Sequence, residues 1–144
     1  MSIKTSKKFD WKPEYAVGVK SIDEQHQYFF KLMNSLHELS ELSNVNTDRL
    51  REVINDLNQY AKFHFCTEEK FFEQLKYEGA KPHCVAHSNY FVRVKDFTKK
   101  LEMPDVNLKQ ISEDLAEFAA DWLIAHILVD DKKYSSCFKN HNLV

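Results

Sequence analysis

The sequence contains very few of the residues that end helices or form tight turns. Its 144 residues include only two glycines, Gly18 and Gly79, and three prolines. A chain with so few breakers has little of the chemistry that β-hairpins need. The sequence therefore argues against a β-rich fold and predicts a mostly helical one.

The sequence also has few cysteines, no long apolar run and only a small net charge. The three cysteines, Cys66, Cys84 and Cys137, show no C-x-x-C spacing, so we expect free thiols and a cytoplasmic protein. No run of about 18 apolar residues occurs and the N-terminus is polar, so we expect no membrane span. A net charge of -2 gives no electrostatic reason to expect a nucleic acid or an anionic membrane as partner.

Apolar residues recur at helical spacing in four segments between the breakers. We expect helices over about 21–42, 48–77, 82–102 and 108–134, after an N-terminal arm of residues 1–20 and before a loose tail of residues 137–144. Short connections between long helices make neighbouring helices antiparallel. The sequence therefore predicts one all-α domain over residues 1–144, an up-down-up-down antiparallel four-helix bundle with an N-terminal arm.

Three helix ends carry recognisable signals. Ser21 followed by Glu24 is typical of a capping box at the start of the first helix. Asn107 followed by Gln110 indicates the cap of the fourth helix. Gly79 is predicted to stop the second helix.

Histidine and carboxylate side chains gather toward one end of this predicted bundle. Residues four apart share a helix face, and two such pairs occur in the second and third helices. An α-helix rises about 1.5 Å per residue, which gives the height of each residue along the antiparallel helices. By this measure one half of the bundle contains His26, His64, Glu68, His83, His87, His126 and the neighbours Asp130 and Asp131.

Each of these residues has an ordinary structural explanation when taken alone, as a core histidine, a helical pair or a solvated carboxylate. Together they would place many polar groups in an aromatic-rich core, where unpaired polar groups are costly. Metal coordination would remove that cost. His37 lies about 16 Å further along the first helix than His26, and His141 lies in the tail, so neither is expected to take part.

The donor types narrow the choice of metal. Imidazole and carboxylate without thiolate suit iron, manganese or zinc, and seven donors are too many for one ion. The sequence contains no Glu-x-x-His and no His-Glu-x-x-His, which argues against the ferritin-like and metalloprotease motifs.

The spacing His26 … His64-x-x-x-Glu68 … His83-x-x-x-His87 … His126-x-x-x-x-Asp131 resembles that of the hemerythrin family, in particular its single-domain bacterial members. The segments 23–26 and 122–127 and the arm with Trp11 also resemble that family. The resemblance implies that His83, His87 and His126 hold one iron ion and that His26 and His64 hold the other. It further implies that Glu68, Asp131 and an oxo or hydroxo group bridge the two ions.

What the resemblance implies for function is reversible dioxygen binding, for oxygen transport, storage or delivery, without enzymatic activity. At about six ligands per iron, the ion with two histidines keeps one open position. Candidates for the lining of the oxygen pocket are Trp122, Leu123, Phe30 and Trp11, for which plain core packing is the alternative.

Three other functions stay open at the level of the sequence. One is oxygen or redox sensing through a partner protein, and another is an oxidase or peroxidase-type di-iron activity. The third is a metal-free helical interaction module, which would leave the aligned donors unexplained.

Asp131 has an unusual position relative to His126. It follows by five residues, about 140° round an ideal helix, whereas Asp130 would align better. Because the resemblance favours Asp131, we expect a π-type distortion there. Cys66, two residues from His64, is expected to face outward.

Overall fold

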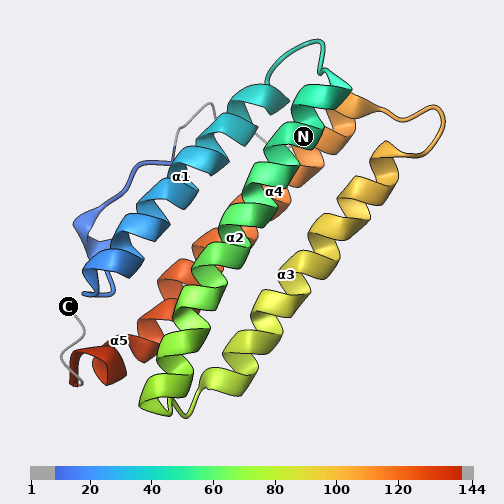
Figure 1. Ribbon diagram of the computed structural model, residues 1–144. Helices are drawn as coiled ribbons and strands as arrows, with labels where there is room; N and C mark the ends of the chain where they lie inside the picture. Colours follow the sequence, from blue (N-terminus) through green and yellow to red (C-terminus); the bar gives the residue numbers. More distant parts are fainter. Residues whose placement is uncertain (1–8, 141–144) are drawn as a thin grey trace.

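The computed structural model describes residues 9–140 and shows four long rods packed side by side (Figure 1). Four helices come first: α1 (Lys20–Ser40), α2 (Thr47–Leu75), α3 (Ala80–Leu101) and α4 (Leu108–Ala125). A π-helical segment, η2 (His126–Asp130), and α5 (Asp131–Asn140) then continue the fourth rod, and a short turn, η1 (Pro13–Tyr15), precedes α1. The all-α fold with antiparallel neighbours is confirmed.

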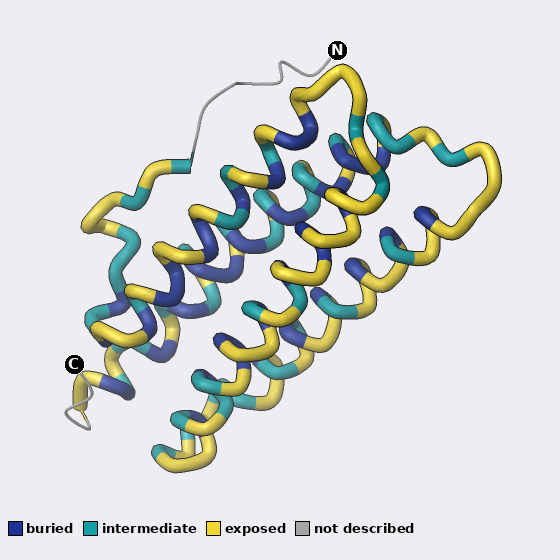
Figure 2. The backbone as a smooth tube through the Cα atoms, turned by 45° about the horizontal axis from the view of Figure 1, so that its top comes forward, coloured by how far each residue is buried: buried dark blue, intermediate teal, exposed yellow. Residues whose placement is uncertain are grey.

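Buried residues line the inward face of every rod (Figure 2). They form two separate apolar clusters. The larger cluster fills most of the bundle and includes Phe29, Phe65, Tyr90 and Ile127. The smaller cluster comprises Val17, Val19, Ile22, Phe72, Tyr134 and Phe138 and lies where the arm meets α5. The space between the two clusters is occupied by polar side chains, described below.

The predicted capping box at the start of the first helix is wrong. The helix begins at Lys20, and the residue before it, Val19, offers no side-chain cap. The chain instead turns at Gly18, which has a φ of +89°. The turn brings two amides of the arm onto Asp23, whose Oδ1 accepts from the Val17 N–H at 2.8 Å and Oδ2 from the Gly18 N–H at 3.2 Å.

The predicted stop at Gly79 is also wrong. Helix α2 ends at Leu75, and Lys76 takes the left-handed conformation with a φ of 53°. Gly79 has a negative φ and stands directly before α3. The predicted cap at Asn107 is confirmed, because its side chain accepts from the Gln110 N–H at 3.0 Å.

The prediction of a loose tail from residue 137 is wrong for residues 137–140, which belong to α5. Phe138 is fully buried, stacks on Tyr134 with ring centroids 4.3 Å apart, and contacts Phe72 at 5.9 Å. Packing into the smaller cluster therefore orders a segment whose sequence is mostly polar. Residues 1–8 of the arm and 141–144 of the tail, with His141, lie outside the described residues.

The arm is fastened to α5 by side chains that donate to its carbonyl groups. Lys132 Nζ lies 2.7 Å from the carbonyl oxygens of both Glu14 and Ala16, and Ser135 Oγ donates to the Val17 carbonyl. Arm and last helix thus close the same end of the bundle. Among the described residues, no helix has the length and apolarity needed to cross a lipid bilayer.

Replacement of Phe138 by alanine should lower the free energy of unfolding by about 3–5 kcal/mol, because a fully buried aromatic ring leaves a cavity. Urea denaturation followed by circular dichroism measures this change. Val92→Ala removes a side chain that is 60% exposed on α3 and serves as the control. Equal stability of the two variants would contradict the assignment of residues 137–140 to the core.

Candidate metal centre

A layer of polar side chains crosses the bundle between the two apolar clusters. All four rods contribute to it, and none of its members is more than 5% exposed. The members are His26 from α1, His64 and Glu68 from α2, His83 and His87 from α3, His126 from η2 and Asp131 from α5. The structure therefore brings together every residue that the sequence predicted as a ligand.

The π-helical segment decides which of two neighbouring aspartates reaches this layer. Residues His126–Asp130 form a π turn, which confirms the distortion that the family resemblance predicted. The extra residue rotates Asp131 into the core, where it is fully buried. The side chain of Asp130 stays 36% exposed and accepts a hydrogen bond from His126 Nδ1 at 3.1 Å.

The inward-facing atoms form two groups that could each hold a metal ion. Within each group the nitrogen and oxygen atoms lie within 4.8 Å of one another. One group consists of Glu68, His83, His87 and His126, and the other of His26, His64, Glu68 and Asp131.

Asp131 spans the two groups. Its Oδ1 lies 2.9 Å from His83 Nε2 and 3.1 Å from His126 Nε2, while its Oδ2 lies 2.8 Å from His26 Nε2. One oxygen thus faces the three-histidine side and the other faces the two-histidine side. A carboxylate in this position can bridge two ions.

Glu68 spans the groups in the same way. Its Oε1 lies 3.0 Å from His87 Nε2 and its Oε2 lies 3.6 Å from His64 Nε2. The phenol of Tyr134, buried in the smaller cluster, donates a hydrogen bond to Oε2 at 2.5 Å. This bond fixes the orientation of the carboxylate and leaves Oε1 free of hydrogen bonds.

Three histidines have an oxygen acceptor on the outer nitrogen of the ring. The pairs are His64 Nδ1 with Gln25 Oε1 at 2.6 Å, His87 Nδ1 with Glu69 Oε2 at 2.7 Å, and His126 Nδ1 with Asp130 Oδ2 at 3.1 Å. Because each acceptor holds the proton on Nδ1, the Nε2 lone pair points into the layer. Histidines that ligate metals are held in this way.

Several buried atoms of the layer lack a hydrogen-bond donor. They include Glu68 Oε1, both carboxylate oxygens of Asp131, and His83 Nε2. The Nε2 atoms of His26 and His64 also face one another at 3.2 Å. Two buried carboxylates surrounded by lone pairs are unfavourable unless a cation neutralises them. The donor set therefore fits a non-haem metal centre.

In the protein without metal, the pKa values of the histidines differ between the two sides of the layer. Burial lowers the pKa of His64 to about 3, although Glu68 acts to raise it. Burial also acts to lower the pKa of His126, but the carboxylates of Asp131, Asp130 and Glu68 raise it to about 10. Without a metal, protons on the three-histidine side would supply the positive charge that the two carboxylates require, so metal binding should displace protons.

Aromatic rings enclose both sides of the layer. Phe65 stacks on His87 with ring centroids 3.8 Å apart and an interplanar angle of 6°. Phe29 meets His64 edge-on at 5.3 Å. These two phenylalanines were missed in the sequence, because their helical spacing marks them only as core residues.

The four predicted pocket residues do not gather on one side of the layer. Trp11 lies 6.4 Å from the His26 ring and 5.5 Å from Phe30, on the two-histidine side. Trp122 stacks on His126 at 4.5 Å, on the three-histidine side. Leu123 is fully buried in the larger apolar cluster.

Other residues lie where the sequence indicated, or were missed. His37 stays outside the layer, with Nε2 3.6 Å from Glu41 Oε1, and Cys66 is exposed as expected. Gln25 and Glu69, which orient histidines of other helices, were not predicted. Each is the sequence neighbour of a candidate ligand, and that adjacency is the only signal that could have indicated them.

Fold and site together are those of a helical bundle whose buried side chains suit a non-haem metal centre, and comparisons with known proteins identify its family. The family model "Hemerythrin HHE cation binding domain" matches residues 17–137. The chain belongs to the hemerythrin family.

Individual relatives match over nearly their whole length. The chain is 28% identical over 128 residues to the bacteriohemerythrin of Clostridium acetobutylicum, covering 88% of this chain and 98% of that protein. It is 27% identical over 128 residues to a hemerythrin of Sipunculus nudus, covering 89% and 92%. A crystal structure of wild-type hemerythrin has a TM-score of 0.78 at 27% identity, covering 90% of this chain and 96% of that one.

Replacement of Glu69 by alanine should weaken metal retention about 10- to 100-fold, because His87 loses the acceptor that orients its ring. Competition with a chelator, followed by metal analysis of the protein, measures this change. Glu73→Ala removes an exposed carboxylate one turn further along α2 and should leave retention unchanged. Identical retention in both variants would show that Glu69 has no orienting role.

Proposed function

We propose that this chain binds dioxygen reversibly at a pair of iron ions in the polar layer. The observation that carries the proposal is the unequal division of histidines, three on one side and two on the other, with two carboxylates spanning both groups. A pair of ferrous ions supplies two electrons, which dioxygen takes up on binding and gives back on release.

The proposed ligands follow the two groups. His83, His87 and His126 would hold one ion, and His26 and His64 would hold the other. Glu68 and Asp131 would bind both. Because His26 and His64 offer one histidine fewer than the other group, an ion held there would leave a position for a small ligand on that side.

The surroundings of that side favour binding without turnover. Phe29 is buried against His64, and Trp11 lies 6.4 Å from the His26 ring and packs on the buried Phe30. Apart from the proposed ligands His26 and Glu68, the polar side chain that contacts His64 is Gln25, a neutral amide that accepts from Nδ1 and cannot serve as a general acid. A dry, apolar surrounding keeps water and anions from displacing a bound ligand, as a carrier requires and as an oxidase with a second substrate does not.

The first experiment is spectroscopic. The iron-loaded protein is reduced without oxygen, exposed to air, and then freed of oxygen again. We expect a visible absorption band that appears with oxygen and disappears when it is removed, with two iron ions per chain by metal analysis. Direct conversion to a stable diferric spectrum, with no reversible band, would contradict the proposal.

Trp11→Ala should shorten the lifetime of the oxygenated form severalfold, because it opens the cover over His26 to water. The decay of the visible band in air measures this lifetime. Asp10→Ala changes an exposed neighbour in the same segment and should decay like the unchanged protein. A lifetime in Trp11→Ala equal to that of this control would remove Trp11 from the pocket.

A further inference from the structure

A groove of ≈ 290 Å³ lies on the outside of the bundle between α1 and α2. Tyr28 of α1 lines it together with Asp56, Gln59, Tyr60 and Phe63 of α2. Its volume is close to the lower end of the range of small-molecule sites, roughly 300–1,000 Å³. No side chain of the polar layer lines this groove, so a ligand bound there would lie outside the candidate metal centre.

Two of the three aromatic rings in the groove are exposed to solvent. Phe63 is 57% exposed and Tyr28 is 45% exposed, and among residues 9–140 every other aromatic side chain is at least partly buried. The protein thus exposes these two rings at a single place, beside the partly buried ring of Tyr60. Apolar surface gathered in this way is typical of a binding site.

The three rings are inclined to one another. The ring centroids of Tyr28 and Tyr60 are 4.4 Å apart at an interplanar angle of 47°, and those of Tyr60 and Phe63 are 5.7 Å apart at 50°. Tyr60 is held from the core by Phe29, which meets it edge-on at 5.0 Å. Because the rings are inclined, they do not cover one another's faces as a parallel stack would, and the electron-rich face of an aromatic ring attracts cations.

The charge of the groove is negative. Among the described residues that line it, Asp56 alone carries a charge, and no lysine or arginine of residues 9–140 pairs with it. Lys31 and Lys62 are exposed on the same two helices but do not line the groove. Burial raises the pKa of Tyr60 to about 12, so its phenol stays neutral near pH 7. An unpaired carboxylate beside three neutral rings favours a cation as ligand.

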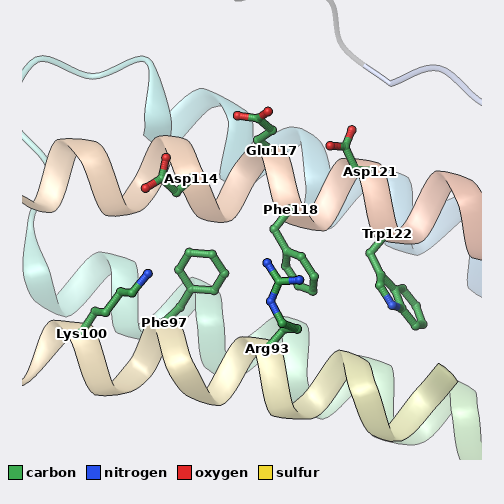
Figure 3. A pocket seen from close by; sticks show the side chains of 8 residues that line it. All are labelled: Arg93, Phe97, Lys100, Asp114, Glu117, Phe118, Asp121 and Trp122. Carbon is green, nitrogen blue, oxygen red and sulfur yellow. The ribbon is translucent and has the colours of Figure 1, made fainter. Parts of the chain in front are cut away.

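The groove between α3 and α4 provides a comparison within the same molecule. There the protein places its own cations over aromatic rings, with Arg93 4.7 Å from the centroid of Phe118 and Lys100 Nζ 5.2 Å from that of Phe97 (Figure 3). Within the described part of the chain, no lysine or arginine lies over the rings of the α1–α2 groove. The place that a side-chain cation takes in one groove is therefore accessible to a ligand in the other.

We propose that the α1–α2 groove binds a small organic cation that carries a quaternary ammonium group. Such a group has no N–H to satisfy, and aromatic faces recognise it. A guanidinium would bring five donors to a groove in which Asp56 offers the one carboxylate. Asp56 would neutralise the charge, and the three rings would contact the methyl groups. This binding goes beyond the proposed oxygen chemistry and does not depend on it.

Binding is tested with choline chloride, by fluorine nuclear magnetic resonance of the iron-loaded protein labelled with fluorotyrosine. Replacing each of the six tyrosines with phenylalanine in turn assigns the resonances. We expect those of Tyr28 and Tyr60 to shift saturably, with a dissociation constant on the order of a millimolar, while those of the buried Tyr90 and Tyr134 stay in place. Shifts that do not saturate, or that sodium chloride reproduces, would overturn the site.

The need for charge is tested with the neutral analogue of choline, in which a tert-butyl group replaces the trimethylammonium group. The two molecules have nearly the same shape, so a difference in affinity reports the charge. We expect the analogue to bind roughly tenfold more weakly. Equal affinity would show that the groove is an apolar site and would overturn the proposal.

Variants locate the ligand in the groove. Asp56→Asn and Phe63→Ala should each weaken choline binding about three- to tenfold, because one removes the charge and the other a ring face. Asp96→Asn removes an exposed carboxylate of α3 outside the groove and should bind choline like the unchanged protein. An equal loss in this control would overturn the site. So would shifts of Tyr28 and Tyr60 that follow protein concentration instead of choline, because a second copy of the chain would then cover the groove.

Discussion

Glu68 and Asp131 put two carboxylates in the middle of a bundle that is apolar above and below them. Among residues 9–140 no lysine or arginine pairs with either carboxylate, and three of their four oxygens lack a hydrogen-bond donor. Burying such charges is unfavourable by several kcal/mol for each ion unless cations lie beside them. The five histidines, their tautomers and the outer acceptors are all arranged so that these cations can be metal ions.

The rest of the bundle serves to keep this layer in place and dry. One apolar cluster lies on each side of it, and its own side chains are at most 5% exposed. Gln25, Glu69 and Asp130 hold histidine rings from outside the layer. The arm and α5 close the adjacent end through Lys132 and Ser135.

Residue spacing predicted the fold and the layer because both depend on helical periodicity. His64 and Glu68, or His83 and His87, need only one turn of helix to meet. The choice of Asp131 over Asp130, and with it the irregular turn, came from the family resemblance and not from the spacing. Contacts between side chains of different helices produce no periodic pattern in the sequence, so they could not be predicted in this way. The Asp23 carboxylate accepts a hydrogen bond from an amide of the arm, and Ser21 does not cap α1. Phe138 is ordered by contact with an aromatic ring of α2. The cross-helix pairs of Gln25 and Glu69 escaped prediction for the same reason.

The π turn at His126–Asp130 also sets the phase of everything that follows it. One residue of an α-helix corresponds to about 100° of rotation, so a deletion within this turn would swing α5 by that angle. Asp131 would leave the metal layer, and Tyr134 and Phe138 would leave the core in the same movement. The π turn therefore couples the position of Asp131 in the layer to the packing of the C-terminal helix, so a change in its length would disturb both.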